Sequence, residues 1–356
     1  MCAQKIPGCR KTGFTLVEML VVIVIIGILA GLLTGAVIMA RTSARIGVVR
    51  SEIGQLELAV QMYKDKYGEY PPDFAFTDSS SPPELRTAAR QRVIQHIRKR
   101  WPRLVIPPGD PDTQWAGFLN GLQQLYPNLT INDDTFTPAS ALVFWLGGLP
   151  EDAFASQWIP QGFHSDPTNP FKPGLPREKP LFEFRRERIV TSPLGYRPDV
   201  GNIPTGPIVY FRSYRLPKTG RFEYGYPVYR EKVGEVLEVV RYPSTGPHPE
   251  FGQAVPYLEP WPDLPDPTST PDLPDPTSTN VQAFAILQLK RSWRNQESFQ
   301  ILAPGLDGHF GIGLDVPAGA GTPSLFRISR LGARFSQEDY DNIANFCVRT
   351  LEDEIE

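Results

Sequence analysis

The chain has 356 residues, of which 41% are hydrophobic and 21% are charged, a composition that is normal for a folded protein of one large or two ordinary domains. Its formal net charge of −3 argues against a general affinity for nucleic acid. The four histidines stand alone, and neither a Gly-x-Ser-x-Gly elbow nor a phosphate-binding glycine loop occurs, so we do not expect an enzyme.

The apolar segment 14–40 is the first predicted element. Its 27 residues carry a single formal charge, Glu18, and as a helix they extend for roughly 40 Å, enough to span a bilayer with some tilt. A secretory signal would end a shorter apolar core at a small-residue cleavage site, whereas Gly13 and two basic residues stand before this run. We therefore expect one transmembrane helix.

The junction before this helix carries a family resemblance. Segment 10–18 reads Arg-Lys-Thr-Gly-Phe-Thr-Leu-Val-Glu, which resembles the class III leader of type IV pilins and type II secretion pseudopilins. The resemblance implies that residues 1–13 are a prepilin leader, that prepilin peptidase cuts between Gly13 and Phe14 on the cytoplasmic side, and that Phe14 is then N-methylated. Removing a leader with three positive charges leaves a net charge of about −6.

The resemblance further implies that Glu18 is the carboxylate used in filament assembly. An unpaired carboxylate in hydrocarbon costs ~3 kcal/mol or considerably more, so it requires a partner or a function. The new ammonium group of Phe14 on a neighbouring subunit would supply that partner. The alternative is a simple anchor in which Glu18 lies near the lipid headgroups.

The same resemblance implies a location and a set of partners. We expect a single-pass protein of the bacterial inner membrane, with a cytoplasmic N-terminus and a periplasmic or extracellular head; basic residues flank the apolar run on both sides, so charge alone does not set the orientation. The expected partners are other pilin-like subunits, prepilin peptidase and an inner-membrane assembly platform. Gly27, Gly31 and Gly35 share one helical face. Either they allow a second helix to approach closely, or they reflect only the general abundance of glycine in membrane helices.

Segment 41–67 is predicted to continue the helix as an amphipathic half. Apolar residues recur at spacings of three and four along one stripe, which comprises Ile46, Val49, Ile53, Leu56, Val60, Tyr63 and Tyr67. This stripe packs on the chain's own globular part or forms a coiled-coil seam. Gly68 and two prolines end the helix, and the ending Tyr-x-x-x-x-Gly-x-Tyr-Pro is also similar to that of the major pseudopilin.

Segment 68–180 is predicted to be an inserted, mainly helical region that compact pseudopilins lack. We expect helices at 83–103, 114–126 and 138–149. The third contains the apolar run 141–146, which should fill core. The helix at 83–103 is basic, and its basic face is either solvated or binds anionic lipid or a partner. Its basic residues are Arg86, Arg90, Arg92, Arg98, Lys99, Arg100 and Arg103.

Segment 181–356 is predicted to form an antiparallel sheet. Short β-branched and aromatic runs separated by Pro and Gly favour strands, at 181–189, 207–214, 227–242, 281–289, 299–302 and 324–328. Within it, Pro-Asp-Leu-Pro-Asp-Pro-Thr-Ser-Thr occurs twice in tandem, which predicts an exposed proline-rich loop at 262–280. The expected fold class is α+β, with the long helix packed on an antiparallel sheet head and an inserted helical region.

Two acidic segments near the C-terminus resemble the calcium loop of the major pseudopilin. They read Gly-Leu-Asp-Gly at 305–308 and Asp-Tyr-Asp-Asn-Ile at 339–343. The resemblance implies a calcium ion with Asp307 and Asp341 as ligands and Asp339 as a third, and calcium takes six to eight oxygen ligands in a flexible shell. The intervening stretch is longer than in the family. The alternative is a tight turn in which Asp307 accepts hydrogen bonds from nearby backbone amides and Gly308 has positive φ.

These features together predict a pseudopilin-like subunit of a type II secretion or type IV pilus-like filament, which works in protein secretion by assembly and without turnover of a substrate. The alternative is a membrane-anchored ligand-binding protein, or a minor pilin at the filament tip, that recognises an exported substrate, a polysaccharide or DNA through the inserted region and the proline-rich loop.

Overall fold

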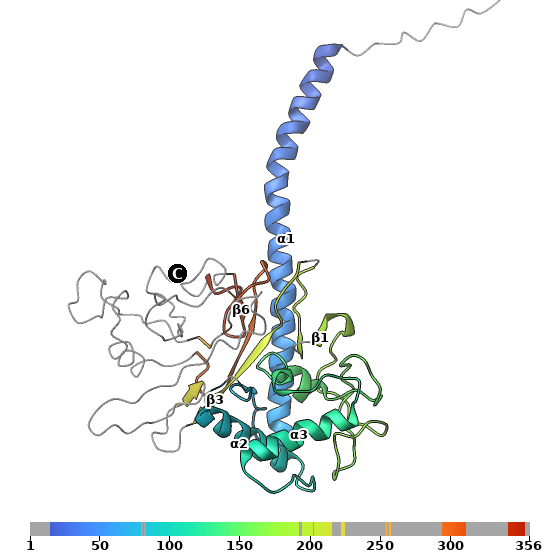
Figure 1. Cartoon of the computed structure of the whole chain (residues 1–356). Helices are drawn as coiled ribbons and strands as arrows, with labels where there is room; N and C mark the ends of the chain where they lie inside the picture. The colour runs from blue at the N-terminus through green and yellow to red at the C-terminus, as the bar shows by residue number, and fades with distance from the viewer. Residues whose placement is uncertain are drawn as a thin grey trace, which may run out of the picture. The chain divides into compact units, whose positions relative to one another are not determined.

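The structure is a computed structural model that describes residues 15–79, 81, 83–191, 194–201, 203–215, 222–224, 254, 256–257, 294–310 and 341–352. Two compact units divide the chain, Met1–Arg45 and Ile46–Glu356. The first contributes one helical segment, and the second contains every strand of the described residues together with the remaining helices (Figure 1). The architecture is α+β, as the sequence predicts.

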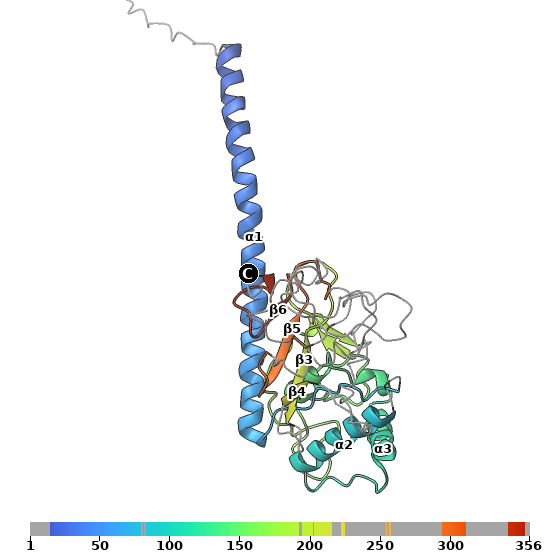
Figure 2. The same cartoon turned by 90° about the vertical axis from the view of Figure 1, so that its left-hand side faces the viewer.

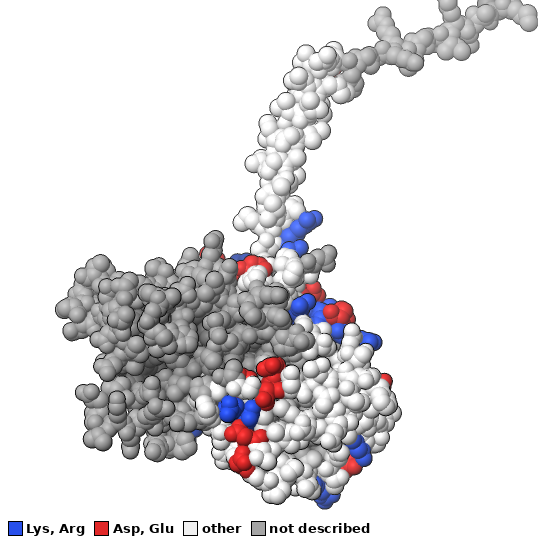
Figure 3. All heavy atoms as spheres, in the orientation of Figure 1, with Lys and Arg blue, Asp and Glu red and all other residues white. Residues whose placement is uncertain are grey.

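Helix α1, Leu16–Tyr67, is the longest element, with 52 residues. It ends where the sequence predicts, because Gly68 takes a left-handed conformation with φ +79° and donates its N–H to the carbonyl of Lys64 at 2.7 Å. Among the described residues, α1 is the one helix long and apolar enough to cross a membrane. In the first unit every described residue, 15–45, is exposed, and the apolar length of the helix displays no charged side chain in the view of Figure 3.

The portion of α1 in the second unit packs on the head through the predicted stripe. Ile46, Val49, Ile53, Leu56, Val60 and Tyr63 are buried there with Ala59, and Tyr67 is partly buried against the same core. The apolar stripe is thus buried against the head of the same chain. It is a core-facing surface and not a coiled-coil seam between copies.

The head contains a four-stranded antiparallel sheet with the strand order β4-β3-β5-β6. The strands are β3 (Val209–Arg215), β4 (Phe222–Tyr224), β5 (Phe299–Ala303) and β6 (Ile343–Ala344). In the central pair Val209 lies opposite Leu302 and Arg212 opposite Phe299. Figure 2 shows this sheet beside the lower half of α1. A separate hairpin joins β1 (Ile189–Thr191) to β2 (Leu194–Tyr196).

The predicted helices at 83–103 and 114–126 are confirmed as α2 (Pro83–Arg100) and α3 (Pro111–Leu125), which pack on each other. Helix α3 starts three residues earlier than predicted, because Asp110 caps it with a hydrogen bond from Thr113 and Pro111 occupies its first position. Beyond α3 the segment 126–180 is largely irregular, with the short turn η1 (Asp133–Thr135). The mainly helical character predicted for 68–180 therefore holds only for its first half.

The helix predicted at 138–149 is confirmed only in part, because the helical residues are 141–147 and most of them form a π-helical turn. The chain forms a single π-helical turn, η2 (Val143–Gly147), and the N–H of Gly148 bonds the carbonyls of both Val143 and Phe144. Gly148 has φ +86°, and a Cβ there would lie 2.4 Å from the carbonyl oxygen of Gly162. The apolar run does fill core as predicted, with the ring of Trp145 against Tyr63, Phe74 and Trp101.

The strand predicted at 181–189 is also wrong, apart from its last residue. Segment 186–188 is a short 3-10 turn, η3 (Arg186–Arg188), and the apolar residues before it contact side chains instead of a partner strand. The rings of Phe182 and Phe184 pack on Tyr196, with centroids 6.2 and 4.9 Å away. The strands predicted at 207–214 and 299–302 are confirmed, whereas those at 227–242, 281–289 and 324–328, and the loop at 262–280, lie outside the described residues.

Candidate functional site

The first candidate site is the start of α1. Gly13 and Phe14 lie outside the described residues, which begin at Thr15. Oε2 of Glu18 accepts hydrogen bonds from the backbone N–H and the hydroxyl of Thr15, at 2.8 and 2.7 Å, and the hydroxyl oxygen accepts one from the N–H of Glu18 at 3.2 Å. This reciprocal pattern is a capping box, so Glu18 also starts the helix.

The sequence contained a signal for this second role of Glu18. Thr15-x-x-Glu18 immediately before an apolar run is the spacing of a capping box. The interpretation of Glu18 solely as an assembly carboxylate missed it. In the isolated chain the carboxylate therefore has partners from its own helix.

The surface of the first helical unit is suited to contact with hydrocarbon or with other helices. Its side chains include Leu32, which is 73% exposed, and Ile26, which is 58% exposed. A Cβ placed at Gly27, Gly31 or Gly35 meets no atom within 4 Å, so these glycines leave a shallow open face. Apolar area on this scale is unfavourable in water, and the segment has the character of a single-pass membrane anchor.

The second candidate site is the predicted calcium loop, whose two halves the fold brings together. Strand β5 leads into the turn at 305–308, and β6 pairs with β5 directly beside it. The N–H of Asp307 donates to Oδ2 of Asp341 at 3.2 Å, and the N–H of Gly305 donates to Oδ1 of Asn342 at 3.1 Å. Gly305 is required by this contact, because a Cβ there would lie 2.0 Å from the Asp341 carboxylate.

The turn at Asp307 also has the geometry of the alternative interpretation. The N–H of His309 donates to Oδ1 of Asp307 at 2.8 Å, and Gly308 has φ +85°. The tight turn is therefore present. It is compatible with an ion, because it uses one oxygen of Asp307 and directs that residue's backbone toward Asp341.

The electrostatics of this loop centre on Asp341. Burial, followed by repulsion from Asp307, raises the pKa of Asp341 from 3.8 to about 6. Its Oδ1 is buried and has no hydrogen-bond partner. The described residues contain no group of three or more acidic, His or Cys side chains that could hold a metal, and Asp339 lies outside them. Two carboxylates with one orphaned oxygen suit a hard cation that takes further ligands from backbone carbonyls.

This loop is fixed to the amphipathic half of α1. The guanidinium of Arg50 donates to the carbonyls of Ala344 and Asn345, at 3.2 and 3.3 Å. The side-chain oxygen of Asn345 accepts the N–H of Ile301 at 3.0 Å. The segment after Asp341 therefore joins the helix to the sheet, and its sequence position, about 290 residues from Arg50, gives no local signal of that contact.

Helix α2 proves not to be a simple basic surface. Arg90 is buried and donates to the carbonyl of Thr77 and to Asp112 and Asp133. Arg92 lies over the ring of Tyr214, and Arg100 lies over the rings of Tyr67 and several other aromatic residues. Both sequence interpretations of this helix, a solvated face and a lipid or partner surface, are wrong for these three arginines, which stabilise the head.

A buried chain of hydrogen bonds joins α1, α2 and the loop after α1 through His96. The guanidinium of Arg100 donates to the hydroxyl oxygen of Tyr63 at 3.1 Å, and that oxygen lies 2.7 Å from Nε2 of His96. Nδ1 of His96 lies 2.8 Å from Oε1 of Glu69. Because arginine only donates, the Tyr63 hydroxyl donates to Nε2 and neutral His96 donates from Nδ1 to Glu69.

The comparisons with known proteins agree with the first candidate site. The family model of the prokaryotic N-terminal methylation motif matches residues 9–34. No curated protein and no solved structure matches the chain. The chain thus carries the class III prepilin leader and the apolar helix that are typical of type IV pilin-like proteins.

Proposed function

We propose that this chain, which carries the N-terminal methylation motif of type IV pilin-like proteins, is a pseudopilin-like subunit of a type II secretion or type IV pilus-like filament. One observation carries the proposal: the motif runs directly into a continuous helix whose described residues up to Arg45 are all exposed. Such a helix suits a subunit that is stored in a membrane and then packed among the same helices of other copies.

The proposal assigns a role to each residue of the junction. Prepilin peptidase cuts between Gly13 and Phe14 on the cytoplasmic side of the inner membrane, Phe14 is N-methylated, and its ammonium pairs with Glu18 of a neighbouring subunit during assembly. The head, from Ile46 onward, then lies in the periplasm or outside the cell, and an inner-membrane platform drives assembly. The work of the protein is assembly, without turnover of a substrate.

The N-terminus of the protein tests this proposal. In cells with an active prepilin peptidase, mass spectrometry of the membrane fraction should find a mature chain that begins with methylated Phe14. Gly13→Leu should leave the leader attached, whereas Gly8→Leu, a matched glycine inside the leader, should be cleaved normally. A wild-type chain that retains its leader at steady state would contradict the proposed function.

We further propose that Asp307 and Asp341 bind one calcium ion, with Asp339 as a third ligand. The buried, unpaired Oδ1 of Asp341 favours this site. The ion would supply positive charge to two neighbouring carboxylates and so hold the C-terminal segment against β5. A ligand that binds only the folded head stabilises it by about 2.7 kcal/mol at a hundredfold excess over its Kd.

Thermal melts of a soluble fragment that begins at Ala44 test the calcium site. The melting temperature should rise with calcium and fall with chelator. Asp341→Asn should abolish the response, and Asp134→Asn, which changes an exposed carboxylate of η1, should retain it. Equal melts of the wild-type fragment with calcium and with chelator would leave the tight turn as the complete account of this loop.

A further inference from the structure

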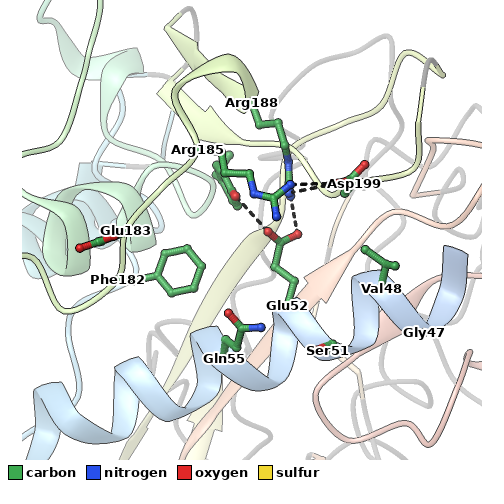
Figure 4. Close-up of a pocket in the computed structure, with 11 residues that line it drawn as sticks. Gly47, Val48, Ser51, Glu52, Gln55, Phe182, Glu183, Arg185, Arg188 and Asp199 are labelled. Atoms are coloured by element: carbon green, nitrogen blue, oxygen red, sulfur yellow. Dashed lines mark hydrogen bonds and ion pairs between the residues drawn. The ribbon is translucent and has the colours of Figure 1, made fainter.

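The cleft beside α1 that Figure 4 shows has carboxylates that are already paired or directed away. It has a volume of about 390 Å³ and lies in the second unit. Glu52 is ion-paired with Arg188, and Asp199 lies 3.4 Å from Arg185. The carboxylate of Glu183 points out of the cleft. This cleft therefore presents no free carboxylate to a ligand.

A groove of about 380 Å³ at α3 has a different character, because every residue that lines it is uncharged. Segment 104–107 and α3 contribute most of the lining, and Phe171 adds an aromatic ring. Gly121 of α3 also lines the groove, and a Cβ there would meet no atom within 4 Å, so this part of the helix leaves open space. A charged ligand would lose its hydration in the groove without gaining an ion pair.

The backbone of Val105 and Ile106 lies at this groove without hydrogen-bond partners. Within the described part of the chain, no N–H or carbonyl group of these two residues is bonded. Segment 104–107 has no regular secondary structure, and the prolines at 107 and 108 favour extended backbone in the residues before them. Val105 is 87% exposed. An exposed, β-branched and unpaired segment is a template for the addition of a strand.

Two side-chain amides in the lining, of Gln124 and Asn169, make no hydrogen bond within the described residues. An amide both donates and accepts, so it can pair with a peptide N–H or carbonyl. A ligand of pure hydrocarbon, such as an acyl chain, would leave these amides and the backbone of Val105 and Ile106 without partners. The groove thus favours a ligand that combines apolar groups with regularly spaced donors and acceptors, which is the chemistry of an extended peptide.

The described part of this chain does not present such a peptide to a second copy. Outside α1 its exposed large hydrophobic residues are isolated in the sequence, namely Val105, Phe154, Leu175 and Val348. Those of α1 belong to a helix, whose backbone groups are already hydrogen-bonded. A different polypeptide is therefore the better occupant of the groove.

We propose that the groove binds an extended, uncharged segment of a partner polypeptide, which pairs as a strand with Val105 and Ile106 and places alternate apolar side chains over Gly121. This site goes beyond the proposed function, because it gives the head a partner whether or not the N-terminal helix assembles. Main-chain pairing supplies the affinity, and the uncharged lining selects against segments with charged side chains.

Peptide binding to the full-length chain in lipid nanodiscs tests the groove. The probe is a fluorescein-labelled pool of heptapeptides in which Thr alternates with Val, Ile or Leu, and empty nanodiscs provide the blank. The wild-type chain should raise the anisotropy of the probe in a saturable manner. Gly121→Leu should weaken binding at least about tenfold, because its side chain occupies the groove. Ala116→Leu, at an exposed position of α3 outside the groove, should bind as the wild type does.

A second pool, methylated on its backbone nitrogens, separates strand pairing from apolar contact. It keeps the side chains but cannot donate backbone hydrogen bonds, so it should bind at least about tenfold more weakly than the first pool. Equal binding of the two pools would show a purely apolar site and overturn the proposal. The absence of saturable binding to the wild-type chain would also overturn it.

The remaining outcomes concern the position and the identity of the occupant. Undiminished binding by Gly121→Leu would place the peptide elsewhere and contradict the proposal. If wild-type chains form cross-linked pairs in nanodiscs that Gly121→Leu abolishes, the occupant is a second copy and the proposal is wrong. Protease resistance of each variant checks that the head has folded. None of these results depends on leader cleavage, so the proposed function is tested separately.

Discussion

Glu18 has hydrogen-bond partners before any assembly takes place. The N–H and the hydroxyl of Thr15 both donate to its carboxylate, so the charge is partly neutralised by its own helix end. In a filament the Phe14 ammonium of a neighbour would compete with Thr15 for the same oxygen atoms. The residue thus combines a role in starting the helix with the proposed role in joining subunits.

We predict that Glu18→Val leaves leader cleavage, membrane insertion and head stability unchanged but removes the subunit from sheared or detergent-extracted filaments. Valine inserts into hydrocarbon more easily than glutamate, so any loss arises in assembly. Thr15→Val is the matched control, since it removes the hydroxyl and retains the carboxylate. Filament content is measured by immunoblot after shearing, and wild-type incorporation of Glu18→Val would make Glu18 a bystander.

His96 makes the stability of the head depend on pH. Burial lowers the pKa of His96 from its ordinary value of 6.5, against the opposite effect of Glu69. The groups around the ring are Tyr63, Glu69, Lys99, Arg100 and Arg212. A protonated ring would direct a second N–H at Tyr63 and leave the Tyr63 hydroxyl without an acceptor. The pKa of Glu69 is lowered to about 2, mainly by the hydrogen bond from His96, so Glu69 stays ionised above pH 5.

We predict that the contribution of His96 to the free energy of unfolding is constant above about pH 6.5. Below that pH the contribution falls, because the imidazole binds a proton more readily in the unfolded chain than in the folded one. Asp341 contributes with the opposite sign, since its raised pKa favours the folded state at low pH and this contribution is lost as pH rises from 3.8 through about 6. Urea unfolding between pH 8 and 5 in the Asp341→Asn background isolates the effect. His96→Gln should remove the remaining slope, and a slope that persists would assign it to another group.

At the scale of elements, α2 is fixed to the head by ion pairs as much as by its apolar face. Arg90 joins α2 to α3 through Asp112 and to η1 through Asp133, with contacts of 2.8 and 3.0 Å. The indole of Trp115 also donates to Asp133 at 2.8 Å. One guanidinium therefore pairs with two carboxylates, and Asp112 also lies 3.8 Å from Arg86.

We predict that Arg90→Ala lowers the free energy of unfolding by about 2 to 3 kcal/mol, because it leaves Asp133 without its cation and Asp112 with only the longer ion pair to Arg86 at 3.8 Å. The figure lies below that of a fully buried pair, since the side chains of Asp112 and Asp133 are 37% and 31% exposed. Arg98→Ala, at an exposed position of the same helix, should change it by less than about 0.5 kcal/mol. Urea unfolding of the Ala44 fragment provides the measurement, and equal effects of both substitutions would exclude the ion-pair role.

The helices were predictable where a local pattern determines them. The stripe from Ile46 to Tyr63 and the stop at Gly68 need only spacing and φ preference, and both were confirmed. The π-helical type of the turn at Val143–Gly147 was missed because a run that is buried on every side has no periodicity to reveal its type. The strand at 181–189 failed because alternating aromatic residues fit a sheet and equally fit the face of Tyr196.

The candidate sites divide in the same way. The resemblance located the N-terminal junction and paired the segments around Asp307 and Asp341, and the latter pairing was confirmed by the contact between them. The contacts of Arg90 and Glu52 were missed, because nothing near these residues in the sequence shows that Asp133 or Arg188 will lie beside them. The residues of these ion pairs lie roughly 40 to 140 positions apart in the sequence, so the pairs form only once the chain has folded and no local pattern predicts them.

For the whole molecule, the two units should differ in their need for detergent. Residues 15–45 expose apolar side chains throughout, whereas the second unit buries its own core. We predict that the fragment from Ala44 remains in the supernatant after ultracentrifugation without detergent, while the full chain requires detergent because apolar helix surface is unfavourable in water. Immunoblots of the two fractions measure this, and a fragment that sediments would show that the head cannot fold without the helix before it.

The contacts of Arg50 also set an order of events during biosynthesis. The carbonyls that Arg50 binds belong to residues 344 and 345, and the strand beside them begins at residue 299. At ribosomal rates of about 5 to 20 residues per second, the core-facing stripe of α1 waits at least about 15 seconds for these partners. The apolar segment is complete long before then. On the proposed function, the head therefore completes its folding only after the apolar segment that would anchor it has been made.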